Sequence, residues 1–355
     1  MTKGLVERRA FLGAVGGLVG AQAWAEPVIT RPVVSEIRTR ATMAQRLILP
    51  SVVLLFGATI FAVTLTAQRP KAASPDRTLV VMLGTGNPTI DPDRSGPATA
   101  IVVKDTAYLV DFGAGVVRRA QEAVLTREIK AIDPTRLRVV FATHLHSDHT
   151  VGYADLILTP WVMGRPFPLE VYGPKGIEAM SRHMLEAYRV DTEARNGPEG
   201  MKRVNTDAYR VNAHEIEAGV VYKDANVTVT AFRTHHAIES YGYRFDTADR
   251  RVVVSGDTSP AQATIDACNG CDVLIHESIS PAWLAAAPPA RREAFEKFSS
   301  KYHTTTTQLA ELAVKAKPKL LVLYHHSGNT PEELNAEMRA VYAGHFIVSR
   351  DLDVY

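Results

Sequence analysis

Three histidines and one aspartate fall within six consecutive residues, shortly after the mostly apolar residues 137–141, which predict a buried strand. The signature is His-x-His-x-Asp-His, formed by His144, His146, Asp148 and His149. Neutral imidazoles with a carboxylate are typical ligands of divalent metal ions. His144 and His146 can turn toward one ion, and Asp148 and His149 can serve a second ion after the chain bends. A solvated polar loop is the alternative, but this composition at a strand end favours a metal site.

A site for two ions needs further ligands, which we expect just past other strand ends. His236, Asp257 and His325 each follow a predicted strand. Asp257 is the natural bridge, because a carboxylate has two oxygens and can hold two ions about 3.5–4 Å apart. His235 and His326 are neighbours that could replace two of these ligands, but the motif register favours His236 and His325. With Asp257 between the ions, the expected ligands are His144, His146 and His236 for one ion, and Asp148, His149 and His325 for the other.

The order of predicted elements indicates an α/β (α+β) fold, an αββα sandwich of two mixed sheets flanked by helices. Strands are predicted at 78–83, 98–103, 107–110, 137–141, from 169, twice within 220–232, and at 251–255, 273–275 and 319–324. Helices are predicted up to about residue 125, at 177–188, 261–267 and 304–316, and within 281–299 as a lid-like insertion. Residues 191–210 predict irregular chain, either over the active-site mouth or as solvated surface. The two cysteines, Cys268 and Cys271, predict a tight turn that can close as a disulfide.

Two apolar segments precede this domain. Residues 7–25 resemble a twin-arginine export signal, and residues 47–67 are 21 uncharged, mostly apolar residues, long enough to span a bilayer. The arginines between them disfavour two spans, so we expect either a functional start at Met43 or removal of the first segment. Residues 1–75 are therefore predicted to be an export signal or membrane anchor with a linker, contacting the membrane. The hydrolase domain, 76–355, is expected in the periplasm or anchored facing it.

The signature at residues 144–149 looks like that of the metallo-β-lactamase superfamily. Further motifs resemble its tRNase Z branch with arylsulfatase and phosphodiesterase relatives: Val-Tyr-Gly-Pro-Lys-Gly, His-x-x-x-Ser-Tyr-Gly-Tyr-Arg, Ser-Gly-Asp-Thr, Leu-Tyr-His-His-Ser, His-Glu-Ser at 276–278 and His-Thr-Thr at 303–305. The resemblance covers nearly everything from Thr78 to about Gly328. It implies that Glu277 orients His303 and that His303 is the general acid. A structural histidine at a helix start is the alternative for His303.

The chain departs from the tRNase Z branch in one respect. That branch carries a long arm that grips tRNA between the Gly-Tyr-Arg and Gly-Asp-Thr motifs, whereas only residues 245–255 separate the two motifs here. The sequence offers neither an arm nor a basic patch with interleaved aromatic residues, and its formal net charge of +2 favours no partner class. We therefore expect a small phosphoester or sulfoester substrate rather than a nucleic acid. A homodimer is compatible with the sequence.

The expected function is that of an exported hydrolase with two zinc ions, acting on phosphodiester or sulfate ester bonds; manganese and iron also suit these ligands. The two ions are expected to activate a bridging water, Asp148 to aim it, and His303 to protonate the departing oxygen. Three alternatives stay open: a tRNase Z-type 3′-tRNA endoribonuclease, a lactonase or β-lactamase, and a non-enzymatic metal-binding protein. The lactonase and β-lactamase readings give no role to Glu277 or His303. A non-enzymatic protein would be expected to have lost one of the metal ligands, and none is missing from this sequence.

Overall fold

Two mixed β-sheets form the centre of the computed structural model, which describes residues 77–200, 206–328 and 330–355. The first sheet has six strands in chain order: β1 (Leu79–Gly84), β2 (Ala98–Val103), β3 (Thr106–Val110), β4 (Val139–Phe141), β5 (Leu169–Gly173) and β6 (Val211–Glu215). The second sheet has seven: β7 (Gly219–Lys223), β8 (Val227–Arg233), β9 (Tyr241–Thr247), β10 (Arg251–Val254), β11 (Val273–Ile279), β12 (Leu320–Ser327) and β13 (Phe346–Val348). Each sheet begins with antiparallel pairs and continues with parallel ones.

The two sheets pack face to face because their strands are apolar on both sides. In β1, Val80 and Met82 enter the core between the sheets, whereas Val81 and Leu83 face the helices on the outside. This alternation follows from the two-residue period of a strand, and it explains why buried strands are continuous apolar runs. Phe141 of the first sheet reaches across to the second, where its ring centroid lies 5.5 Å from that of Phe245.

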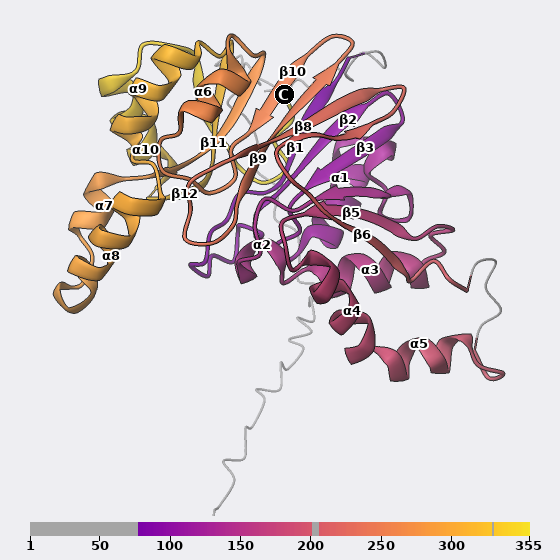
Figure 1. The fold of residues 1–355 in the computed structure, drawn as a ribbon. Helices are drawn as coiled ribbons and strands as arrows, with labels where there is room; N and C mark the ends of the chain where they lie inside the picture. The colour runs from indigo at the N-terminus through magenta and orange to yellow at the C-terminus, as the bar shows by residue number, and fades with distance from the viewer. Residues whose placement is uncertain (1–76, 201–205, 329) are drawn as a thin grey trace, which may run out of the picture. The chain divides into compact units, whose positions relative to one another are not determined.

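Helices cover the outer face of each sheet (Figure 1). On the first sheet these are α1 (Val116–Arg127) and α3 (Tyr153–Val162), with α4 (Ile177–Ala187) and α5 (Arg189–Asn196) beyond them; the short α2 is Ser147–Thr150. On the second sheet they are α6 (Gln262–Cys268), α9 (Thr306–Ala316) and α10 (Pro331–Val341). Two more, α7 (Pro281–Ala285) and α8 (Pro289–Tyr302), project away from the sheets. The predicted αββα sandwich is thus confirmed.

Strand direction gathers the polar strand ends at one edge of the sandwich. In the second sheet β8 is antiparallel to β9, and β9 is antiparallel to β10, so β8 runs the same way as β10, β11 and β12. In the first sheet β3 and β4 are parallel. The carboxyl ends of parallel strands meet at one edge of a sheet, where α/β proteins commonly place their sites.

Some elements differ from the sequence prediction. Part of the segment expected to be irregular forms α5. The strand β6 was not predicted, because its half-exposed sequence Val-Asn-Ala-His-Glu holds only two apolar residues, one of them alanine. The strand predicted to be last continues to Ser327 and is followed by α10 and β13. The disulfide between Cys268 and Cys271 agrees with the prediction. The short segment between the Gly-Tyr-Arg and Gly-Asp-Thr motifs joins β9 and β10 as a hairpin.

The predicted export signal and anchor, within residues 1–75, lie outside the described residues. Among the helices of the described ranges, none combines the length and the apolar character needed to cross a bilayer.

Candidate metal centre

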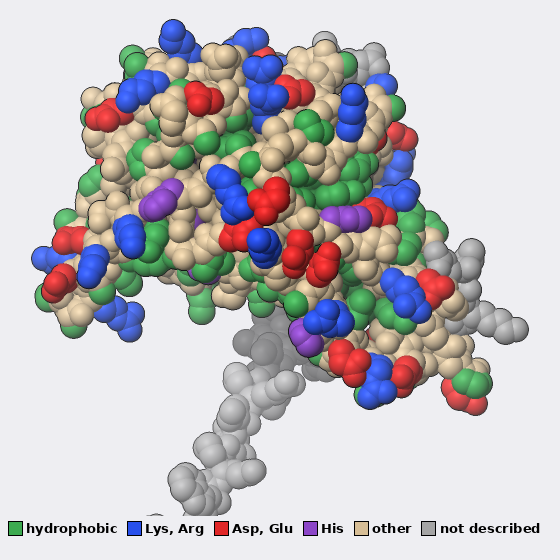
Figure 2. Space-filling view, in the orientation of Figure 1, with side chains coloured by type: hydrophobic (Ala, Val, Ile, Leu, Met, Phe, Trp, Pro, Cys, Tyr) green, Lys and Arg blue, Asp and Glu red, His purple; other side chains and the backbone are tan. Residues whose placement is uncertain are grey.

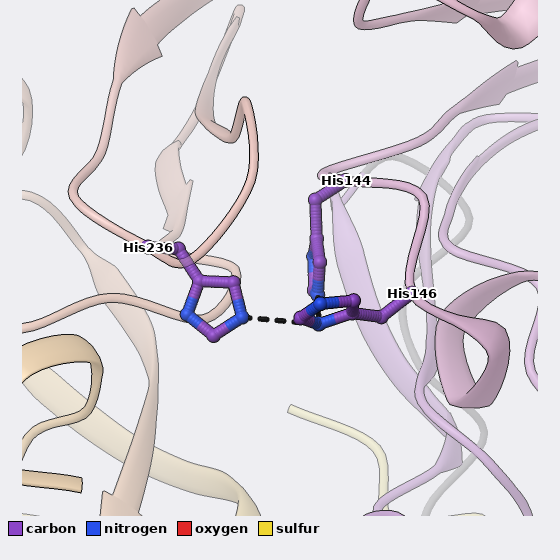
Figure 3. Close-up of side chains that lie close together, drawn as sticks. All are labelled: His144, His146 and His236. Carbon is purple, nitrogen blue, oxygen red and sulfur yellow. Dashed lines mark hydrogen bonds between the residues drawn. The ribbon is translucent and has the colours of Figure 1, made fainter. Parts of the chain in front are cut away.

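Three histidines converge on one point at the edge of the sandwich (Figure 3). His146 Nδ1 lies 3.0 Å from His144 Nε2 and 3.1 Å from His236 Nε2. Nitrogen ligands about 2.0–2.1 Å from one ion stand about 2.9–3.4 Å apart, depending on the coordination geometry. The three ring nitrogens therefore have the spacing of ligands around a single cation.

A second cluster lies beside the first. His325 Nε2 is 3.1 Å from Asp148 Oδ2, and His149 Nε2 is 3.5 Å from the same oxygen. Asp257 adjoins both clusters: its Oδ1 is 3.3 Å from His149 Nε2, and its Oδ2 is 3.5 Å from His325 Nε2. Asp257 Oδ2 also lies 3.9 Å from His144 Nε2. The structure thus brings together all seven residues named from the sequence, with Asp257 between the two groups of three.

The two halves of the chain meet at this edge through close backbone contacts. The amide of Tyr241, at the start of β9, donates to the carbonyl of Thr143, which precedes the first histidine. Gly256 has φ +64°, and a Cβ there would lie 2.9 Å from Thr143 Cβ. A side chain at residue 256 would therefore push apart the two segments that carry His144 and Asp257.

A bulge in β12 aims His325 at the site. The pairing of β11 with β12 changes register between Glu277 and Ile279, and Ile279 then pairs with Ser327. His325 takes the left-handed value φ +46°, which is uncommon for a residue with a side chain. Bulges of this kind often redirect a side chain beside an active site. The sequence placed His325 after its predicted strand, but the structure places it within β12.

Asp111, at the end of β3, orients the histidines from behind, and the sequence analysis did not assign it a role. Its Oδ2 is 2.9 Å from His149 Nδ1. The Thr143 backbone amide donates to its Oδ1, and the Thr143 hydroxyl donates to its Oδ2. Because that hydroxyl donates to Asp111, it can accept from His144 Nδ1, 3.0 Å away. Both imidazoles are thereby held with Nε2 facing the site, as is usual for metal-binding histidines.

The charges at the site suit a cation. Burial lowers the pKa of His144 well below its usual value. Burial also lowers the pKa of His149, but the carboxylates of Asp257 and Asp111 outweigh it and raise that pKa well above the usual value. In return, His325 and His149 bring the pKa of Asp257 well below its usual value despite its burial. The carboxylates therefore draw positive charge into a buried position.

Two buried atoms at this position have no hydrogen-bond partner among the described residues, His149 Nε2 and Asp257 Oδ1. Unpaired buried polar atoms are rare and call for an explanation. A divalent cation would satisfy both atoms and supply the positive charge, and imidazole and carboxylate are suitable donors. The residues of both clusters therefore fit a divalent metal.

Glu277 and His303 form the pair expected beside the metals. His303 Nδ1 lies 2.8 Å and 3.0 Å from the two carboxylate oxygens of Glu277, which is fully buried. The Thr258 amide donates to Glu277 Oε1 over 2.6 Å and fixes the carboxylate further. Burial lowers the pKa of His303, but the charge and hydrogen bonds of Glu277 raise it to about 9. Because Glu277 engages Nδ1, Nε2 is the ring nitrogen left to act at the site. The His303 ring centroid lies 5.1 Å from that of His236.

The remaining histidines lie outside the clusters. His235 is exposed, with Nδ1 2.9 Å from Ser259 Oγ, and His326 is buried with Nε2 3.3 Å from the Ser349 carbonyl. Neither therefore replaces its neighbour at the site. His276 is buried, with Nε2 unpartnered among the described residues. The other three are exposed or half-buried: His183, His214 and His345.

Comparisons with known proteins agree with this geometry. The profile of the Beta-lactamase superfamily domain matches residues 106–326. A protein named ribonuclease Z from Mycobacterium sp. (strain KMS) is 35% identical over 269 residues, which cover 74% of this chain and 88% of the relative. The chain belongs to the metallo-β-lactamase superfamily, in its ribonuclease Z branch. As a member of this superfamily, it is a metal-dependent hydrolase.

Solved structures of the superfamily share the fold. The metallo-β-lactamase fold protein YhfI from Bacillus subtilis has a TM-score of 0.60 at 16% identity, covering 78% of this chain and 98% of its own. The short form of human tRNase Z has a TM-score of 0.57 at 22% identity, with coverage of 78% and 98%. At these identities the likeness shows the architecture, which is the predicted sandwich.

The relatives overturn one prediction. We expected a small ester substrate rather than a nucleic acid, whereas the similar proteins are named for action on RNA. The expectation was wrong because it weighed a missing arm above the motifs that the chain retains. The short β9–β10 hairpin removes one means of gripping RNA but leaves the metal centre and the Glu277–His303 pair unchanged.

Proposed function

We propose that this protein is a metal-dependent endoribonuclease that hydrolyses a phosphodiester bond near the 3′ end of precursor tRNA. The observation that carries this proposal is the 35% identity to a ribonuclease Z over 74% of the chain. The seven clustered side chains support it, because they suit two divalent ions, with zinc the first choice for histidine and aspartate ligands. Asp257, which adjoins both clusters, would be the ligand that they share.

The side chains have separate tasks in the proposed reaction. When bound, the two cations lower the pKa of water and stabilise negative charge on the phosphoryl oxygens. Asp148 accepts a hydrogen bond from the attacking water and aims it at phosphorus. His303, with Nδ1 held by Glu277, gives the proton on Nε2 to the departing oxygen as the phosphorus–oxygen ester bond breaks. The raised pKa of His303 keeps that proton available at neutral pH.

The test is a substrate panel with the metal-loaded protein. A 3′-extended precursor tRNA, bis-p-nitrophenyl phosphate, p-nitrophenyl sulfate, a lactone and nitrocefin are each incubated with and without chelator. We expect cleavage of the RNA at a defined position, its loss with chelator and its return when zinc or manganese is added. An intact RNA alongside rapid turnover of the small diester would contradict the proposal. Turnover of only the lactone or nitrocefin would contradict it as well.

A further inference from the structure

The helix α8 lies at the site and is almost fully exposed. Of its fourteen residues, Ser299 is the one that is buried, so the helix is held at its ends rather than by the core. Its end adjoins the metal centre, because His303 is the C-cap residue. We propose that one face of α8 is a stacking platform for the single-stranded end of the RNA substrate. This inference rests on the proposed function and names the element that binds the substrate.

The platform residues share one face of the helix. Arg291, Phe295, Phe298 and Tyr302 are spaced four, three and four apart, which is the spacing of a single stripe on an α-helix. Phe295 is 37% exposed and Phe298 is 42% exposed. Exposed aromatic rings in a row mark a surface that binds a partner, because they cost free energy in water.

The stripe runs directly to the reacting groups. The ring centroid of Phe298 lies 5.4 Å from that of His303 and 6.4 Å from that of His236. Tyr302 follows along the helix, with its centroid 5.2 Å from that of Phe298. Its carbonyl oxygen is 3.1 Å from His236 Nδ1 and can accept a hydrogen bond from it. A base stacked on Phe298 would therefore lie next to the proposed acid and the metal clusters.

Basic side chains surround the aromatic stripe. The helix carries four basic residues against two acidic ones, Glu293 and Glu296, and the basic set is Arg291, Arg292, Lys297 and Lys301. Lys301 Nζ lies 4.8 Å above the ring of Tyr302. Figure 2 shows basic and hydrophobic side chains together on the projecting α7–α8 region. The helix therefore combines basic and aromatic side chains on one exposed element, which the sequence analysis did not single out.

This combination fits unpaired nucleotides. Aromatic rings stack on the faces of bases, and neighbouring cations bind the phosphates between them; together they form the usual surface for single strands. Bases within a duplex are already stacked on one another and cannot use the rings in this way. The position beside the clusters fits the nucleotides next to the scissile bond.

The experiment measures binding separately from cleavage. The metal-loaded full-length protein is titrated into a labelled, 2′-O-methylated single-stranded oligonucleotide, and anisotropy gives the dissociation constant. A denaturing gel checks that the oligonucleotide stays intact during the titration. The variants are Phe298→Ala and Phe298→Tyr, with Leu125→Ala as a matched control, since Leu125 is 72% exposed on α1. Thermal unfolding checks that each variant is folded.

We expect Phe298→Ala to weaken binding roughly tenfold, because the variant loses the ring on which a base would stack. Phe298→Tyr keeps a ring and should bind within about twofold of the parent, and Leu125→Ala should bind like the parent. A paired duplex of the same sequence should bind more weakly than the single strand. Equal binding by Phe298→Ala and the parent, or binding to anionic vesicles with none to the oligonucleotide, would overturn the platform. In either case cleavage of precursor tRNA by the parent would leave the proposed function standing.

Discussion

The two halves of the molecule supply their metal-centre residues in different ways. The half built on the first sheet provides four from one segment, residues 144–149, which bends through α2 directly after β4. The half built on the second sheet provides His236, Asp257 and His325, each from a different strand or strand end. The first set is close in the sequence, whereas the second is assembled only by the parallel arrangement of β8, β10 and β12. The residues from the first sheet are therefore grouped by the sequence itself, whereas those from the second sheet come together only when the chain folds.

The largest expected effect comes from removing the residue that joins the two sets. Asp257→Ala should lower the occupancy of both clusters and reduce turnover roughly a thousandfold or more, because both lose a ligand. His146→Ala is the comparison, since His146 is half-buried and adjoins only the first cluster. Metal content and kcat of the purified variants give the answer. Two ions retained by Asp257→Ala would show that the two sets do not share this carboxylate.

The next largest effect is expected from Asp111, which orients the histidines of residues 144–149. Asp111→Asn should weaken metal binding about 10- to 100-fold, because Asp111 fixes the orientation of His149 and, through Thr143, of His144. The matched variant in the other half is Glu277→Gln. It should keep its metal and lose roughly a hundredfold in kcat, since Glu277 contacts His303 and Thr258. Titration with a zinc-competing dye measures the metal affinity of each variant. Equal affinity of Asp111→Asn and Glu277→Gln would show that Asp111 does not support metal binding more than Glu277 does.

A smaller effect is expected on stability rather than on chemistry. Arg165 is buried after α3, the helix that follows the metal segment, and burial lowers its pKa to about 10. Its guanidinium donates to the backbone carbonyls of Leu156, Ile157, Phe167 and Ala208. Arg165→Met should lower the free energy of unfolding by about 3 kcal/mol, because these carbonyls lose their partner.

Arg118→Ala is the control for this measurement. Arg118 pairs with Asp155 on the surface and its side chain is 76% exposed, so the variant should change stability by less than about 1 kcal/mol. Urea unfolding measures both variants. Equal free energies of unfolding for Arg165→Met and Arg118→Ala would show that the hydrogen bonds of Arg165 to the carbonyls of α3 do not stabilise the fold.

The smallest effect is expected from the disulfide on the outside of the second half. Cys268 and Cys271 are three positions apart, so the bond closes a very short loop and restricts the unfolded chain little. Replacing both cysteines by alanine should lower the free energy of unfolding by about 2 kcal/mol or less, without changing metal content. Unfolding with and without reductant checks this for the parent protein. A loss of bound metal on reduction would link the disulfide to the site.

The same contrast explains what the sequence could predict. Residues 144–149 carry their chemistry within one short segment, and Asp257 and His325 follow apolar runs that are easy to recognise as strands. Asp111 was missed because it is a single carboxylate at a strand end, and its task depends on β3 lying parallel to β4. The platform on α8 was missed because the helix was predicted to end by residue 299, and because the approach of Phe298 to His303 and His236 is a property of the folded chain. The edge strand β6 has too little apolar character to indicate a strand.

The most direct test of the two-cluster centre is an anomalous difference map from crystals of the zinc-loaded protein. The account predicts two peaks about 3.5–4 Å apart. One should lie beside His146 and His236 and the other beside His149 and His325, with Asp257 between them. A single peak, or zinc bound only away from these side chains, would contradict it.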